Sequence, residues 1–102
     1  MLIAEHETES IVAPDRLVSE TRLDFRSAGL CHLERVIQRS STRLQIDLQH
    51  TTTIDASGLG VLVLLQKRAR EKMVATKLLH PPAAVKQLLE LTKLGYLFEV
   101  ED

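Results

Sequence analysis

The chain has 102 residues, of which 44% are hydrophobic and 26% charged, and its net charge is -1. This length suffices for a modest core, so we expect a single domain over residues 1–102. The near-neutral charge and the 3% of aromatic residues argue against nucleic-acid binding, which favours basic and stacking side chains. Apolar runs fall well short of the roughly 20 residues of a membrane span, and residues 1–7 lack a signal-peptide pattern. The lone Cys31 cannot form an internal disulfide, so we expect a cytoplasmic protein. Because the apolar runs are short, we also expect no membrane insertion.

The N-terminal third predicts short extended pieces followed by a helix. Residues 1–9 are mostly polar and form either a frayed end or a weak first strand. Residues 10–13 are a short strand candidate that Pro14 ends. Residues 15–18 either continue that strand or form an adjoining extended piece.

A helix is predicted over residues 22–38, and Ser19 or Thr21 can cap its start. Gly29 lies inside it and costs about 1 kcal/mol relative to alanine, which weakens the prediction of an unbroken helix. The apolar residues repeat at helical spacing, so one face should pack inward. The residues expected on that inward face are Leu23, Leu30, Leu33 and Ile37, with Val36 beside them.

A strand, a helix and a second strand are predicted over residues 44–79. In residues 44–48, apolar and polar side chains alternate, which is typical of a strand with one buried face. Residues 57–71 predict a helix that is apolar on every side in its first half, and residues 74–79 predict the next strand. This order favours a parallel pair with a crossover helix, and therefore an α/β layered domain.

The C-terminal quarter predicts a last helix and a short closing segment. Pro81 and Pro82 can open that helix, because proline lacks the N–H that would be unpaired there anyway. Gly95 is a natural stop. Residues 97–100 then pack as a tail or as a last strand.

The junction before the central helix has the composition of a docking or anion site. Asp55 is placed to cap the unpaired N–H groups of the first turn, and Ser57 adds a hydroxyl. Gly58 and Gly60 are poor helix formers, so two of them in one turn need a reason. A bare backbone allows close approach either by another chain or by a neighbouring element of the same chain. On the local sequence alone, a tight turn with internal packing is the more frequent explanation.

Residues 54–65, Ile-Asp-Ala-Ser-Gly-Leu-Gly followed by five apolar residues, resemble the signature of the STAS domain family. The family is named for sulphate transporters and anti-sigma factor antagonists. Residues 44–48 look like its preceding strand, and residues 81–100 are similar to its closing helix and tail. The resemblance implies a STAS-type α/β layered fold. Its central sheet would be mostly parallel, with about four to five strands and helices packed against it.

In anti-sigma factor antagonists, the resemblance implies docking on a partner kinase, which phosphorylates the hydroxyl residue directly after the motif's Asp. Here that position is Ala56, which has no hydroxyl. Either Ser57 or Thr53 has become the acceptor, or the protein is not switched by phosphate, and we favour the last. Leu59 is expected on the docking side. The residues to which the resemblance assigns partner binding are Asp55, Ala56, Ser57, Gly58, Leu59 and Gly60.

Two partner classes fit this resemblance. The first is an anti-sigma factor or a related serine-kinase-like switch protein, and the family pattern favours it slightly. The second is a transporter ATPase, because small free-standing STAS proteins also resemble the accessory subunit of an ABC-type phospholipid transport system. A third and weaker alternative is a nucleotide sensor that uses the helix N-terminus.

The residue pattern does not indicate an enzyme, a metal site or a cofactor site. Ser57 lacks the glycine two places earlier that a nucleophile elbow needs. Gly58 and Gly60 lack the third glycine of a dinucleotide loop, and no lysine follows them as in a phosphate loop. We therefore expect a non-catalytic protein. The histidines are scattered without metal-ligand spacing and are expected as surface or capping residues: His6, His32, His50 and His80.

Overall fold

The computed structural model describes residues 9–102, so the expectation for residues 1–9 falls, except for Glu9, outside the described residues. Each helix connects strands that run parallel to one another, as a crossover requires. In chain order the elements are β1 (Ser10–Val12), β2 (Arg16–Leu17), α2 (Arg22–Gln38), β3 (Arg43–Asp47), β4 (Thr53–Ile54), α3 (Ala56–Glu71), β5 (Ala75–Leu79), α4 (Ala83–Thr92), the 3-10 helix η1 (Gly95–Leu97) and β6 (Glu99–Glu101).

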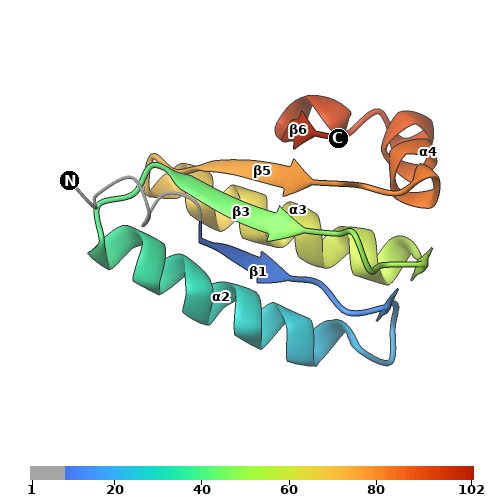
Figure 1. Cartoon of the computed structure of the whole chain (residues 1–102), viewed down its shortest axis with the longest axis horizontal. Helices are drawn as coiled ribbons and strands as arrows, with labels where there is room; N and C mark the ends of the chain where they lie inside the picture. The colour runs from blue at the N-terminus through green and yellow to red at the C-terminus, as the bar shows by residue number, and fades with distance from the viewer. Residues whose placement is uncertain (1–8) are drawn as a thin grey trace.

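Within the described part of the chain, the main sheet has four parallel strands in the order β1-β3-β5-β6 (Figure 1). Ile11 pairs with Ile46, Ile46 with Leu78, and Leu78 with Val100, which fixes the register across the sheet. The expected α/β fold with a mostly parallel sheet is thereby confirmed. Figure 1 places α4 beyond the end at which β3 and β5 terminate.

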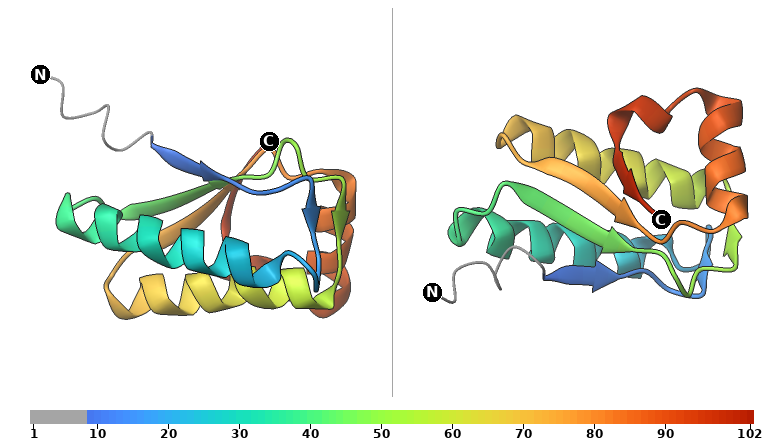
Figure 2. Two further views of the ribbon diagram at one scale, coloured as in Figure 1. Left: turned by 90° about the horizontal axis from the view of Figure 1, so that it is seen from below. Right: turned by 45° about the horizontal axis from the view of Figure 1, so that its top comes forward.

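Helices α2 and α3 lie side by side on one face of the main sheet (Figure 2). The opposite face carries polar side chains, since strand residues alternate between the two faces. Arg43 Nε lies 2.8 Å from Glu99 Oε1, and Lys77 Nζ lies 2.6 Å from Glu101 Oε1. These ion pairs link β6 to β3 and to β5 on a face that is open to solvent, and such pairs add little stability.

The core lies between the sheet and the two helices. Alternating residues of β3 and β5 point into it, as the sequence pattern of residues 44–48 and 74–79 predicted. The α3 helix is buried along much of its first half, as expected for a helix that is apolar on every side. The largest fully buried apolar side chains are Leu17, Leu44, Ile46, Leu48, Leu62, Leu65, Leu78 and Val85.

The bounds of α2 match the predicted residues 22–38, but the expected inward face is wrong at two positions. Leu23 is 59% exposed and Ile37 is 36% exposed. Gly29 lies on the face that α2 does bury, where a Cβ would lie 2.6 Å from Leu65 Cδ1. The missing side chain lets α2 and α3 pack closely without breaking the helix. The residues that α2 buries are Phe25, Gly29, His32, Leu33 and Val36.

A second, two-stranded parallel sheet joins β2 to β4, with Leu17 paired to Ile54. Residues 15–18 therefore form an adjoining extended piece and do not continue β1. Thr51 is buried beneath this connection, and its Oγ1 donates a hydrogen bond to the carbonyl oxygen of Pro14 at 2.8 Å. The small sheet holds the segments before α2 and α3 side by side, and so positions the two helix starts.

The C-terminal segment agrees with the prediction except at its stop signal. Pro82 is the N-cap of α4, and Phe98 is buried just before β6, which forms the last strand. The helix ends at Lys93 in the left-handed conformation with φ 59°, and Gly95 instead begins η1. The prediction that Gly95 stops the helix is therefore wrong, because a lysine takes the conformation that usually favours glycine.

Candidate partner-binding site

Asp55 caps α3 and also ties its start to the loop before α2. The Asp55 Oδ1 accepts a hydrogen bond from the Gly58 N–H at 2.9 Å, and Oδ2 accepts one from the Ser19 N–H at 3.1 Å. The predicted cap is thus confirmed, and the Ser19 contact adds a link across the chain that the local pattern did not indicate. Both donors stabilise the ionised carboxylate, the Gly58 N–H most strongly, so the pKa of Asp55 lies below its ordinary 3.8.

Gly58 is needed by the internal packing of the fold. It is buried, and a Cβ at this position would lie 2.0 Å from the carbonyl oxygen of Leu17. No side chain can occupy that space unless the β2 backbone moves. Of the two explanations left open by the sequence, close approach by a neighbouring element applies to Gly58.

Leu59 does not lie on the surface. It is 5% exposed and belongs to the core cluster. Its expected place on the docking side is therefore wrong, because the first turn of α3 directs this side chain toward the core. An acidic substitution of Leu59 would destabilise the fold before it tested any docking.

The solvent-facing part of the motif consists of Ala56, Ser57 and Gly60. Ala56 and Gly60 are exposed, and Ser57 is partly exposed. A Cβ on Gly60 would meet nothing within 4 Å. The packing of the described residues therefore does not require a glycine there, although glycine costs about 1 kcal/mol inside a helix. The backbone at Gly60 is therefore open to close approach by another chain, the other explanation that the sequence left open.

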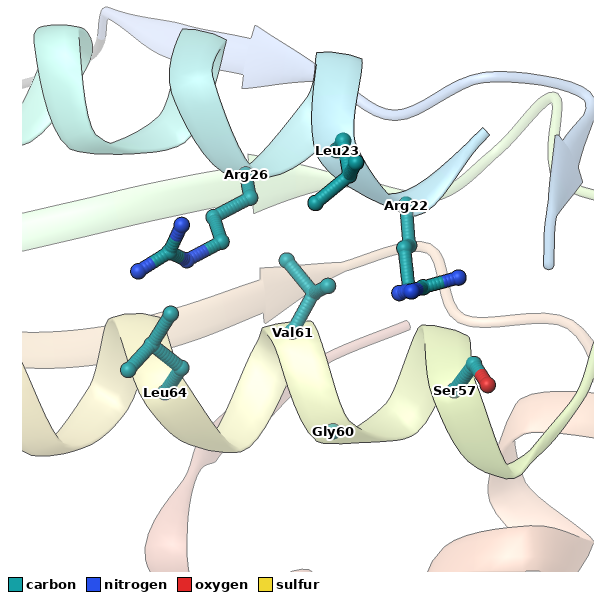
Figure 3. A pocket seen from close by; sticks show the side chains of 7 residues that line it. All are labelled: Arg22, Leu23, Arg26, Ser57, Gly60, Val61 and Leu64. Carbon is teal, nitrogen blue, oxygen red and sulfur yellow. The ribbon is translucent and has the colours of Figure 1, made fainter. Parts of the chain in front are cut away.

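A groove with a volume of about 330 Å³ lies beside this exposed part, between the N-terminal halves of the two helices (Figure 3). We call it the α2–α3 groove. Both helices begin at the same end of it, so the positive ends of both helix dipoles lie there. Helix α2 contributes Arg22, Leu23 and Arg26 to its lining. Helix α3 contributes Ser57, Gly60, Val61 and Leu64.

A chain of hydrogen bonds fixes one arginine at the edge of the groove. The Arg22 guanidinium donates to the Ser19 carbonyl oxygen at 2.8 Å and lies 2.9 Å from the Ser19 hydroxyl. Ser19 is in turn held through its N–H by Asp55. Asp55 therefore contributes to the site by positioning, and its own carboxylate is occupied by backbone donors.

The sequence was compared with models of protein families. The model described as Mlab, STAS domain matches residues 13–99, which is most of the chain. The chain belongs to the STAS family. No curated protein matches the sequence significantly.

Among solved structures, this STAS domain is similar to a protein from Thermotoga maritima that is assigned as an anti-sigma factor antagonist. The match has a TM-score of 0.76 and 21% sequence identity, and it covers 96% of this chain and 90% of the other. Similarity at this identity shows a shared fold. This structural match extends the agreement with the STAS fold over nearly the whole chain.

The STAS motif places Ala56 where the resemblance expects a hydroxyl acceptor, and the nearest hydroxyls take different positions. Ser57 lines the α2–α3 groove, whereas Thr53 is exposed on β4. Both stay candidate acceptors, and Ser57 faces Arg22 across the groove, whereas Arg26 lies farther along it, opposite Leu64 (Figure 3).

The histidines and carboxylates of the described residues form no metal site of three or more ligands. His50 and His80 are exposed, as expected, and His6 lies outside the described residues. His32 is 1% exposed, so its expected surface or capping role is wrong. Burial against the sheet lowers the pKa of His32. Between residues 9 and 102, no helix has the length and apolar character needed to cross a membrane.

The sequence interpretation did not identify the α2 side of the groove. Arg22 and Arg26 stand four residues apart, so they share one helix face, and this spacing was visible in the sequence. Because Leu23 was expected on the inward face, its exposed position between the two arginines was not predicted. The tertiary packing of the buried face of α2, on which Gly29 lies against Leu65, fixes the rotation that exposes Leu23.

Proposed function

We propose that this STAS domain is a non-catalytic regulatory module that binds a protein partner in the cytoplasm. Its partner would be an anti-sigma factor or a related switch kinase, as for anti-sigma factor antagonists. The binding surface includes Ala56, Ser57 and Gly60 at the start of α3. Asp55, Gly58 and Leu59 support this surface from within, through the cap and the core contacts described above.

The observation that carries this proposal is the unoccupied space at Gly60. The folded chain would gain helix stability from alanine at this exposed position, because alanine has the higher helix propensity. A glycine there is explained when another chain packs against the bare backbone. The exposed apolar side chain of Leu23 lies across the same groove and supports the same conclusion.

The proposal includes the absence of the usual phosphoswitch. Ala56 is exposed at the acceptor position of the motif and offers no oxygen to phosphorylate. A phosphate carries about -1.5 to -2 charges and would disturb an interface built on glycine and apolar side chains. Without such an acceptor, partner binding would be controlled by concentration or by the partner's own state.

The test is a pull-down of the tagged full-length chain from its own cells, comparing wild type with Gly60→Arg and Met73→Arg. Gly60→Arg adds a long side chain in open space and should remove the partner while the melting temperature stays within a few degrees. Met73 is 87% exposed at the far end of α3, so Met73→Arg should retain the partner.

Mass spectrometry of the retained proteins identifies the partner class. An anti-sigma factor or switch kinase that depends on Gly60 supports the proposal. If Gly60→Arg retains every partner of the wild type, the surface is wrong.

A transporter ATPase is the second candidate partner. The absence of a hydroxyl at position 56 favours it, because an accessory subunit of a transporter needs no phosphate acceptor there. In the same pull-down, an ATPase that Gly60→Arg loses would assign the surface to this second function.

A further inference from the structure

The α2–α3 groove has a one-sided charge distribution. Its lining contains two arginines and no acidic residue. A second groove of about 330 Å³ lies farther along the same two helices, and its lining includes both signs of charge, with Glu34 and Glu71 beside Arg68 and Lys72. The charges of the two helices are thus balanced at the second groove and unbalanced at the α2–α3 groove.

The positive charge of the α2–α3 groove is available to another molecule. Arg26 is exposed, and it makes no hydrogen bond or ion pair with another of residues 9–102. Arg22 is directed by Ser19, whose hydroxyl and carbonyl are neutral, so the charge of Arg22 is not cancelled either. The helix dipoles contribute less at this end, because the carboxylate of Asp55 caps α3 and Asp24 lies in the first turn of α2.

The floor between the arginines is apolar. Leu23 lies across from Val61 and Leu64, and Gly60 leaves the backbone of α3 bare (Figure 3). The Leu23 side chain is 59% exposed, which is more than a leucine on an inward helix face would be. A ligand that fits must therefore bring apolar side chains to the floor and negative charge to the rim.

We propose that the α2–α3 groove binds an acidic, apolar segment of the partner protein. One or two apolar side chains of that segment pack on Leu23 and Leu64 next to Gly60, and its carboxylates pair with Arg26 and Arg22. This inference rests on the proposed function and adds the chemistry of the partner. A basic segment does not complement the rim, because like charges across an interface repel one another.

The experiment places a photo-reactive benzophenone amino acid at position 23 of the full-length chain in its own cells, and a second one at position 73 as control. After irradiation, the cross-linked partner peptide is sequenced. Position 23 should capture a peptide in which acidic residues outnumber basic ones beside apolar residues. Position 73 should not capture that peptide.

Charge reversal provides the second readout of the same experiment. Arg26→Glu should lower the cross-linking yield at position 23 by about tenfold or more, because it places like charges together. Arg70→Glu makes the same charge change at an exposed residue outside the groove lining and should leave the yield within about twofold.

The outcomes separate this inference from the proposed function. A cross-linked peptide that depends on Gly60 but is basic or neutral, or a yield that Arg26→Glu does not change, overturns the acidic segment and leaves the docking surface in place. A peptide from a second copy of this chain overturns the partner assignment. If position 23 captures nothing and Gly60→Arg retains every partner, both proposals fail.

Discussion

At the scale of single residues, two glycines in one helical turn have different reasons to be there. Gly58 faces the Leu17 carbonyl oxygen with no room for a methyl group, whereas Gly60 faces open space. The sequence motif does not distinguish these two glycines. In the structure, Gly58 is required by the packing of the fold, whereas Gly60 is free to contact another molecule.

We therefore expect opposite effects from the same substitution. Gly58→Ala should lower the free energy of unfolding by about 3 kcal/mol or prevent folding, because the added Cβ overlaps backbone. Gly60→Ala should raise it by about 1 kcal/mol through helix propensity. Urea denaturation followed by circular dichroism measures both. Destabilisation by Gly60→Ala would show that the position has an internal packing role.

At the scale of elements, the start of α3 is joined to the loop before α2 by the two oxygens of one carboxylate. Asp55 accepts from Gly58 within its own helix and from Ser19 across the chain. The β2–β4 pair brings these segments together, so the cap links two elements that are distant in sequence. The same side chain thus caps α3 and holds Ser19, which in turn binds Arg22 at the edge of the α2–α3 groove.

The lowered pKa of Asp55 gives this link a pH dependence with a defined sign. Because the folded state holds the ionised form more strongly, its stabilising effect is complete above the ordinary pKa of 3.8 and is lost as the pH falls through the lower, folded value. Asp55→Asn keeps a capping oxygen and removes the charge, whereas Asp55→Ala removes both. At neutral pH both should melt below wild type, with Asp55→Ala the lower.

Thermal denaturation between about pH 6 and pH 2.5 measures this effect. The gap in melting temperature between wild type and Asp55→Asn should narrow as the pH falls. A gap that stays constant over this range would contradict the ionic contribution of the carboxylate.

At the scale of the whole molecule, the described sheet is covered by helices on one face, and its buried layer contains one histidine. His32 is directed into this layer from α2, and its Nδ1 lies 3.3 Å from Arg35 Nη2. A guanidinium can only donate, so Nδ1 accepts and the neutral ring carries its proton on Nε2. That Nε2 is buried and has no hydrogen-bond partner.

The folded protein should therefore lose stability in mild acid. Burial is the main cause that lowers the pKa of His32 below 6.5; Arg35 and Arg39 lower it further, and Glu9 opposes them. With the folded pKa below the unfolded one, stability is complete above about pH 6.5 and decreases as the pH falls below it. His32→Leu removes the titration and the unpaired N–H.

We expect His32→Leu to raise the free energy of unfolding by about 1 kcal/mol at neutral pH and to flatten its decrease between about pH 7 and pH 5. Urea denaturation at each pH measures both quantities. If the variant keeps the pH dependence of wild type, another group causes it.

Local patterns in the sequence predicted the elements of this protein and its family. The period of the apolar residues predicted α2 at its observed bounds, and Asp55 was predicted as the cap of α3. The alternation in residues 44–48 predicted the buried central strand. These features depend on residues within one or two turns of each other, so the sequence determines them directly.

Contacts between residues distant in sequence decided the rest. The two-residue strands β2 and β4 carry no period, and only their pairing makes them visible. Leu23 is exposed because α2 buries another face, on which Gly29 lies against Leu65. Gly58 differs from Gly60 because Leu17 lies over Gly58 and not over Gly60. The motif by itself therefore predicted the start of α3 as the candidate partner-binding site. Packing between elements determined which of its residues are exposed, because a residue's exposure depends on what the rest of the chain places against it.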